Sequence, residues 1–274
     1  MTRGKLICLT GPAGAGKDTL ALELLTHFLE RGHRMNLLSG SSFFRTTAAY
    51  VVSLGYDGKE TLPMNIWDDI RIQISELEGE KIGEVVHSNR VIGRYLPSHY
   101  MQIEVGTVGS NLAQQLASRY KEFVIGSIRE QIRANSEEGV HTLFPARDSF
   151  ALAASLDSKV EVWCGYIDAS VEVRIKRLRE RYNNRGDEET VVERKVREEL
   201  QRDEQDRRSG TLPPKPTDFI DIKTRQKVTM VNDASIIIYY LDTSELTIPM
   251  AAAYLATTLQ NFFSYGHSPV VGNI

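Results

Sequence analysis

Residues 11–19 read GPAGAGKDT and directly follow the apolar run LICLT at residues 6–10. Glycine tolerates positive φ and has no side chain, so the glycines of this stretch allow successive backbone N–H groups to converge on one anion. Their spacing, together with Lys17, matches G-x-x-x-x-G-K, a loop that binds phosphate when it lies between a strand and a helix. The stretch therefore predicts a nucleotide-phosphate site near the start of the chain.

The segment after the loop has the pattern of an amphipathic helix. Its leucines and Phe28 recur on one stripe and Gly32 follows, so we expect a helix over about residues 18–31. The positive end of this helix would face the phosphates. Most such loops carry Ser or Thr directly after the lysine for Mg²⁺, whereas this chain has Asp18 there and its hydroxyl one residue later, at Thr19. We expect Mg²⁺ at Thr19, with Asp18 as a further candidate ligand.

The composition is that of a globular protein without a strong overall charge. Of 274 residues 41% are hydrophobic, and 33 basic against 36 acidic residues give a net charge of −3. This balance supplies no broad field for nucleic acid or for an anionic membrane. The apolar run after MTRGK is too short for a signal peptide, and no run of 18 apolar residues occurs. We expect a soluble, cytoplasmic protein in which Cys8 and Cys164 are buried thiols, with no disulfide or metal framework.

Short apolar runs alternate with helical stretches along the chain. They are LICLT at 6, MNLLS at 35, HTLFPA at 141, VEVWCGYID at 160 and SIIIYYLD at 235. This alternation predicts an α/β fold with a parallel sheet covered by helices on both faces. Ligands of such folds bind beyond the carboxyl ends of the strands, so the residues that follow each run are the site candidates. One of them, Asp168, precedes a predicted helix and is expected to be its N-cap.

Three further polar clusters are candidates for chemistry. SGSSFFR, from Ser39 to Arg45, could hold a second phosphate, or it could be a capped helix start with a surface arginine. In FPARDS, Arg147 and Asp148 could divide their work between phosphate and a base edge, or form a plain ion pair. The charged run QRDEQDRRSG at 201–210 could meet a ligand, or be a solvated helix face.

The order and spacing of these motifs resemble those of the cytidylate kinases, the CMP/dCMP kinases of the P-loop nucleoside monophosphate kinase group. The resemblance covers about residues 5–262 and is carried by GPAGAGKDT, SGSSFFR, EVGTVGSNLAQQLASRYKEFV, FPARDS, YIDAS, RDEQDRR and DASIIIYYLDTS. It implies a P-loop three-layer α/β sandwich with a five-stranded parallel sheet. It also implies a single kinase domain over residues 1–265, with an acceptor-binding subdomain inserted at 46–105, a mobile lid at 183–216 and a tail at 266–274.

The resemblance also implies site residues. The ATP phosphates and Mg²⁺ would be held by Gly11, Ala13, Gly14, Ala15, Gly16, Lys17, Asp18 and Thr19, with Arg177 against ATP. The α-phosphate of the acceptor would be held by Ser39, Arg45 and Arg147. Cytosine would be read by Asp148, Ser110 and either Arg119 or Lys121. In the lid, Arg202 and Asp206 would meet the sugar and the transferred group, and Arg207 or Arg208 would stabilise the moving phosphoryl.

These expectations predict phosphoryl transfer from ATP to a nucleoside monophosphate, CMP or dCMP first. Two alternatives stay open. One is a P-loop kinase for another (deoxy)nucleoside monophosphate or small acceptor, which the GKDT loop and the long insertion favour. The other is a nucleotide-binding module without catalysis. In each case we expect small-molecule nucleotides as partners, neither nucleic acid nor membrane, and a monomer, with a dimer as the alternative.

Overall fold

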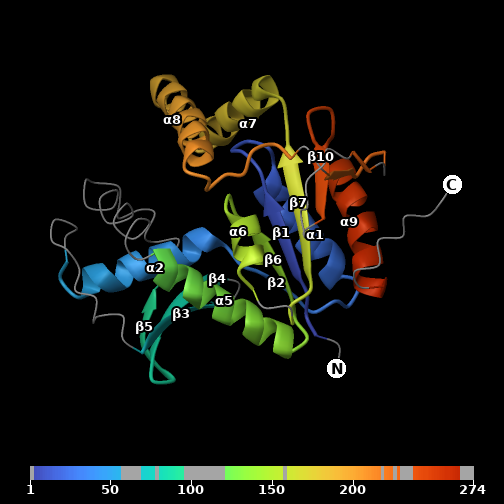
Figure 1. The fold of residues 1–274 in the computed structure, drawn as a ribbon. Coiled ribbons are helices and arrows are strands. Elements are labelled where there is room, and N and C mark those ends of the chain that lie inside the picture. Colours follow the sequence, from blue (N-terminus) through green and yellow to red (C-terminus); the bar gives the residue numbers. More distant parts are fainter. Residues whose placement is uncertain are drawn as a thin grey trace. The chain divides into compact units, whose positions relative to one another are not determined.

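A computed structural model of the protein describes residues 3–56, 69–77, 80–95, 121–156, 159–216, 219–224, 227–228 and 237–265. The chain divides into two compact units. Figure 1 shows the chain coloured by residue number from the N-terminus to the C-terminus. The first unit comprises Met1–Leu37 and Asn135–Ile274, and the second comprises Leu38–Ala134.

The first unit is built on a seven-stranded sheet with the order β2-β6-β1-β7-β10-β8-β9. Its strands are β1 (Leu6–Thr10), β2 (Met35–Leu37), β6 (His141–Pro145), β7 (Val162–Asp168), β8 (Phe219–Asp221), β9 (Lys227–Val228) and β10 (Ile238–Asp242). The first six strands of that order pair in parallel, and β9 pairs antiparallel with β8. All five predicted apolar runs are strands, which confirms the predicted fold class. The parallel part has six strands instead of the expected five, because β8 joins the sheet beyond β10.

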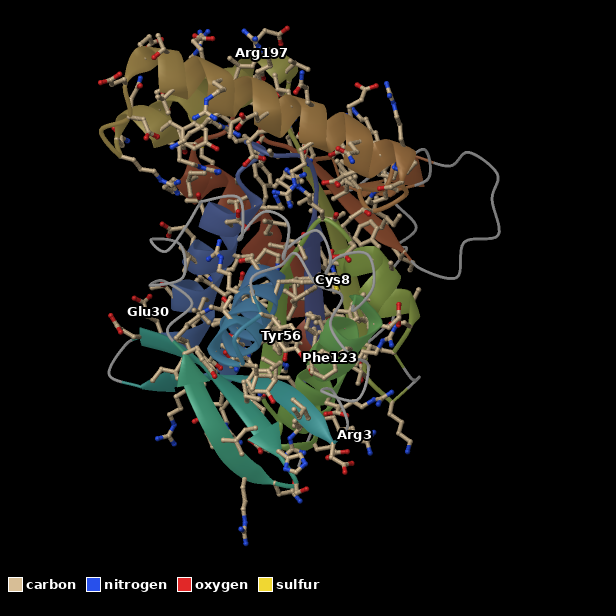
Figure 2. The ribbon with its side chains drawn as sticks, turned by 90° about the vertical axis from the view of Figure 1, so that its left-hand side faces the viewer. Arg3, Cys8, Glu30, Tyr56, Phe123 and Arg197 are labelled. Carbon is tan, nitrogen blue, oxygen red and sulfur yellow. The ribbon has the colours of Figure 1, made fainter. Side chains whose placement is uncertain are left out.

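The strands are buried because helices cover both faces of this sheet. Every residue of β1 is buried, and the side chains of successive residues point to opposite faces of the sheet. Ile7 and Leu9 pack into a core with α1 (Lys17–Leu29) and α9 (Ile248–Tyr265), and Figure 1 shows these two helices on one side of the sheet. On the other side, Cys8 lies in register with Cys164 and near α6 (Ser149–Ala154). Both thiols are buried and unoxidised, as predicted, and Figure 2 places Cys8 within the sheet.

A helical hairpin follows β7 beyond the carboxyl end of the sheet (Figure 1). It consists of α7 (Val171–Asn183) and α8 (Glu189–Arg208), which pack on each other through Leu178, Tyr182, Val192 and Val196. Ala13 of the glycine-rich loop belongs to the same apolar cluster. Figure 2 shows charged side chains such as Arg197 on the outer side of α8. The segment predicted as a lid is therefore mostly one regular helix, and one face of it packs against the loop.

The second unit contains α2 (Gly40–Ser53) and a three-stranded antiparallel sheet. The strands are β3 (Ile70–Leu77), β4 (Glu80–His87) and β5 (Arg90–Tyr95). A Cβ on Gly83 would lie 1.8 Å from Oγ1 of Thr46, so α2 approaches β4 at a point where only glycine fits. The helix α5 (Lys121–Glu137) begins in this unit and ends in the first.

Two further predictions concern the limits of the chain. The expected tail at 266–274 lies outside the described residues. Among the described residues, no helix combines the length and the apolar character needed to cross a bilayer.

Candidate functional site

The glycine-rich loop joins β1 to α1 through backbone conformations that glycine alone adopts without strain. Gly11, Gly14 and Gly16 have φ of 140°, 78° and 95°. A Cβ on Gly11 would lie 1.9 Å from the carbonyl oxygen of Ile167, so this glycine is also required by close packing. The loop thus has the strand, the turn and the helix start that its sequence motif requires.

A set of unpaired backbone donors surrounds the start of α1. Among the described residues, the backbone N–H groups of five residues donate no hydrogen bond: Gly14, Gly16, Lys17, Asp18 and Thr19. The first N–H groups of any helix lack intrahelical partners, and here the left-handed Gly16 extends the set into the loop. Donors of this kind, with the positive end of the helix dipole, form a site for phosphate oxygens.

Lys17 adds a cation to these donors. Its side chain is buried, and among the described residues its ammonium makes no hydrogen bond or ion pair. Burial lowers the pKa of Lys17, and the charge of Asp18 partly opposes this effect. The positive charge of Arg147 lowers this pKa further, whereas the charge of Asp203 raises it. A desolvated lysine needs an anion, and phosphate is the anion that this loop suits.

The first turn of α1 also presents oxygen atoms. Asp18 and Thr19 are exposed, in contrast to the buried residues on either side of them. Carboxylate and hydroxyl oxygens are the ligand type that Mg²⁺ prefers, and Mg²⁺ usually completes its coordination with phosphate and water. The residues present therefore fit the expected ion. Elsewhere, within the described ranges, no three His, Cys, Asp or Glu side chains group as metal ligands.

Arg147 follows β6 and is bound by three carboxylates of α8. Its Nη2 lies 2.9 Å from Oε2 of Glu199 and 3.0 Å from Oδ1 of Asp203, and its Nη1 pairs with Asp206. The backbone of Arg147 is fixed as well, because Oγ1 of Thr10 donates to its carbonyl oxygen at 2.7 Å. Of the residues predicted to bind the acceptor, the structure thus brings Arg147 and Asp206 together.

Two buried charged residues in this region were not predicted to belong to the site. Asp203 is 1% exposed, accepts from the N–H of Ala13 and pairs with Arg174. Arg174 is also buried, and its Nε donates to the carbonyl oxygen of Ala13 at 2.7 Å. The sequence contained one signal for Asp203. It is separated by four residues from Glu199 and by three from Asp206, a spacing that places all three carboxylates on one helix face.

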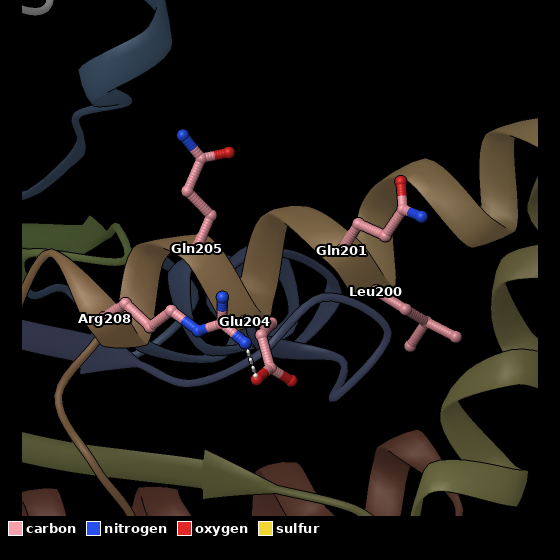
Figure 3. A pocket seen from close by; sticks show the side chains of 5 residues that line it. All are labelled: Leu200, Gln201, Glu204, Gln205 and Arg208. Atoms are coloured by element: carbon pink, nitrogen blue, oxygen red, sulfur yellow. Dashed lines mark hydrogen bonds and ion pairs between the residues drawn. The ribbon is translucent and has the colours of Figure 1, made fainter.

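The lid arginines lie on different sides of α8. The Arg202 side chain is 66% exposed, with its Nε 3.9 Å from Oδ2 of Asp206. Arg207 lies near Tyr166, and its charge opposes the rise in the pKa of Tyr166 that burial causes. Arg208 pairs at 2.8 Å with Glu204, and both line a cavity of about 670 Å³ on the outer face of α8 (Figure 3). The other described lining residues are Leu200, Gln201 and Gln205. Arg208 therefore does not join Arg147.

Arg177 of α7, predicted to lie against ATP, is bound to protein groups beside the loop. Its guanidinium donates to the carbonyl oxygen of Ala15 at 3.4 Å and to both Oγ1 and the carbonyl oxygen of Thr243, at 2.9 and 2.8 Å. The prediction for Asp168 is wrong. The N-cap of α7 is Ser170, whose Oγ accepts from Val173, whereas Asp168 accepts from the hydroxyl of Tyr240. The helix begins at Val171, as expected, so the capping position is Ser170 and Asp168 lies two residues before it.

The remaining acceptor candidates are considered within their own unit. Ser39 precedes α2 without capping it, and its Oγ lies 2.8 Å from Oγ of Ser41. Arg45 is partly buried, which lowers its pKa, and it has no ion-pair partner among the described residues. A partly desolvated guanidinium of this kind is suited to an anionic ligand.

Asp148 and the proposed cytosine readers complete the set. Asp148 occupies the position before α6 without a side-chain cap bond. Ser110 and Arg119 lie outside the described residues. Lys121 is the first residue of α5, and its side chain lies outside the description.

Comparisons with known proteins give structural likeness at low identity. No protein-family model and no curated protein matches the chain. Among solved structures it is similar to the APS kinase CysC of Mycobacterium tuberculosis in complex with AMPPNP and APS, with 14% identity, 95% of this chain and 99% of that chain covered, and a TM-score of 0.40. It is also similar to TT1252 from Thermus thermophilus (14% identity, 94% and 98% covered, TM-score 0.42). A protein from Eubacterium ventriosum is similar as well (11% identity, 93% and 98% covered, TM-score 0.41). At these scores the likeness adds nothing to the strand order described above.

Proposed function

We propose that the protein is an ATP-dependent kinase that transfers a phosphoryl group to a nucleoside monophosphate, with CMP or dCMP as the preferred acceptor. The observation that carries the proposal is the group of donors at the start of α1. Among the described residues, the N–H groups of Gly14, Gly16, Lys17, Asp18 and Thr19 have no hydrogen-bond partner, and the same stretch carries the buried Lys17, whose pKa the charge of Arg147 lowers. Backbone donors at a helix start together with a buried lysine favour a polyphosphate ligand.

Transfer would need little covalent chemistry from the protein, because the acceptor phosphate is already anionic. Lys17 and the loop N–H groups would hold the β- and γ-phosphates of ATP. Arg147 would hold the α-phosphate of the acceptor, and Ser39 and Arg45 stay predicted phosphate ligands. Mg²⁺, held at Thr19 with Asp18, would supply charge compensation at the transferred group. Arg202 and Arg207 of α8 would stabilise charge on the moving phosphoryl and exclude water.

Arg147 can take this role only if it exchanges partners. In the structure, Glu199, Asp203 and Asp206 occupy its guanidinium. A doubly charged phosphate with three acceptor oxygens can compete with these carboxylates for the same N–H groups. Acceptor binding would therefore release Arg147 from part of the α8 carboxylate set.

The choice of CMP or dCMP is supported by the motif order and by Asp148. A carboxylate can accept a hydrogen bond from the exocyclic amine of cytosine, which uracil lacks. Another nucleoside monophosphate or a small molecule is the alternative acceptor. The long insertion favours this alternative, because the second unit has a sheet of its own.

A binding module without catalysis is the second candidate. The same three carboxylates around Arg147 favour it, because a guanidinium that never leaves them cannot hold an acceptor. In that case ATP would bind to the loop and no acceptor would support turnover.

One experiment separates these functions. ATP consumption is measured with CMP, dCMP, UMP, AMP, GMP and dTMP for the wild type and for Lys17→Ala, Arg147→Ala and the control Lys176→Ala. Lys176 is exposed on α7. We expect turnover with CMP or dCMP, at least a hundredfold loss in the first two variants and no loss in the control. ATP binding without turnover for any acceptor would support the binding module and refute the kinase.

A further inference from the structure

Asp203 is the most enclosed charge of the candidate site, and it joins four parts of the first unit. It lies in α8, is 1% exposed, and its carboxylate receives N–H donors from three directions. The N–H of Ala13 in the loop lies 3.2 Å from Oδ1 and 3.1 Å from Oδ2. Arg174 of α7 pairs with Oδ2, and Nη2 of Arg147 lies 3.0 Å from Oδ1.

These contacts fix one residue of the loop, Ala13, through both of its backbone polar groups. Asp203 binds the N–H of Ala13, and Nε of Arg174 binds its carbonyl oxygen at 2.7 Å. A Cβ on the next residue, Gly14, would lie 2.8 Å from the carbonyl oxygen of Arg174, so the loop backbone also packs directly on α7. The loop conformation that presents the phosphate donors is therefore held from outside by an ion pair between two helices.

The same carboxylate also fixes the residue proposed to hold the acceptor phosphate. Arg147 has alternative partners in Glu199 and Asp206, which are 24% and 18% exposed. Asp203 is the most buried of the three, and its other oxygen is bound to Arg174 and Ala13. If phosphate displaces carboxylates from Arg147, the more exposed pair can move into water, whereas Asp203 has donors that keep it in place.

Burial makes this arrangement dependent on charge as well as shape. Arg174 is buried. Burial lowers the pKa of Arg174, and the negative charge of Asp203 opposes this effect. An isolated buried guanidinium is costly, so Arg174 and Asp203 depend on each other. Loss of the carboxylate charge would leave Arg174 uncompensated and would weaken the hold on Ala13.

We propose that Asp203 is a positioning residue that ties α8 to the loop and to Arg147. Through this one side chain, the packing of α8 would fix the donor phosphate site and the acceptor phosphate site at the same time. This inference rests on the proposed function, because it assigns those two sites. Asp203 does not touch the transferred phosphoryl; it acts through Ala13, Arg174 and Arg147.

The test compares Asp203→Asn with Glu204→Gln. Glu204 is the next residue of α8, is 62% exposed and pairs with Arg208 on the outer face. For Asp203→Asn we expect kcat to fall at least about tenfold and KM to rise for both ATP and the acceptor, measured where circular dichroism shows a folded chain. Glu204→Gln should match the wild type. A folded Asp203→Asn protein with kcat and both KM values within twofold of the wild type would overturn the proposal.

A second measurement needs no variant and no turnover. Amide hydrogen exchange of the wild type without nucleotide should show strong protection of Ala13 and weak protection of Gly14, Gly16 and Lys17. ATP should then protect the latter three while leaving Ala13 unchanged. An unprotected Ala13 amide would overturn the proposal even if Asp203→Asn fails to fold. If the protection pattern appears and no acceptor is phosphorylated, the proposed function fails while the coupling of Asp203 to the loop stands.

Discussion

Arg174 and Ala13 are joined side chain to backbone, with Nε of the arginine 2.7 Å from the carbonyl oxygen of the loop residue. The guanidinium also pairs with Asp203, so a single buried arginine connects α7, α8 and the loop. No sequence pattern distinguishes Arg174, because it is one of several basic residues on α7. Its burial is what distinguishes it.

The first prediction concerns the stability that this arginine supplies. Arg174→Met should lower the free energy of unfolding by about 3 kcal/mol, because it leaves the buried Asp203 with one cation fewer. Arg179→Met is the control, since the Arg179–Glu193 pair is nearly half exposed on both sides and should change stability by at most ~1 kcal/mol. Urea unfolding followed by fluorescence measures both. Equal losses in the two variants would contradict the assignment.

The second prediction concerns the loop glycines. Gly11→Ala should cost at least about 3 kcal/mol, because it combines a positive φ with a contact of 1.9 Å to the carbonyl oxygen of Ile167. Gly32 also has a positive φ, 79°, but a Cβ there would meet nothing within 4 Å. Gly32→Ala should cost only about 1 kcal/mol. Thermal unfolding of the two variants separates close packing from backbone strain, and a Gly11→Ala protein as stable as Gly32→Ala would refute the distinction.

The third prediction separates function from stability at Lys17. Lys17→Met removes a buried charge that has no partner among the described residues, so the free energy of unfolding without nucleotide should be unchanged or higher. The wild type should gain about 2.7 kcal/mol at an ATP concentration of 100 Kd, and the variant should lose this gain. Thermal unfolding with and without Mg-ATP measures both effects. A variant that is less stable without nucleotide would mean that the ammonium is stabilised by the protein itself.

The fourth prediction is a pH dependence at the opposite end of the strands. Burial lowers the pKa of His141 from 6.5 to about 4, and nearby His33 and Lys5 add to the effect. Between these values the unfolded chain binds more protons than the folded chain, so stability is complete above about pH 6.5 and falls as the pH drops towards 4.

The variant His141→Gln tests this sign. Its side-chain oxygen can still accept a hydrogen bond where Nδ1 of His141 now accepts from the N–H of Lys5 at 3.0 Å, but it does not titrate. The stability difference between wild type and variant should therefore shrink between pH 6.5 and 4, in urea titrations at each pH. A difference that stays constant over this range would show that His141 is not the titrating group.

The fifth prediction concerns the base of the acceptor. If Asp148 accepts from the cytosine amine, Asp148→Asn should reduce the ratio of kcat/KM for CMP over UMP about tenfold or more, because an amide can pair with either base. Glu180→Gln, at an exposed position of α7, should leave the ratio unchanged. Comparable kcat/KM values for CMP and UMP in the wild type would already exclude this role of Asp148.

Much of the first unit could be predicted because its signals are local. Each apolar run became a strand, and the run at residues 6–10 lies inside the sheet between β6 and β7, where strands are buried on both faces. The short strand at Phe219–Asp221 was missed because three residues carry too little pattern. The strands of the second unit were not predicted. The alternation in IRIQISEL at 70–77 was a signal for one of them, and the turn at Ser88 and Asn89, between β4 and β5, has the positive φ of a two-residue hairpin.

The sequence by itself determined the glycine-rich loop between a strand and a helix, and the alternation of strands and helices along the chain, because glycine spacing, a following helix and apolar runs are properties of neighbouring residues. Only the tertiary structure decided which charges meet. Periodicity places Glu199, Asp203 and Asp206 on one face of a helix, but it does not say that this face packs on the loop. That contact depends on how α8 folds back over α7, and it turns Asp203 from a member of a charged run into a buried partner of Ala13, Arg147 and Arg174.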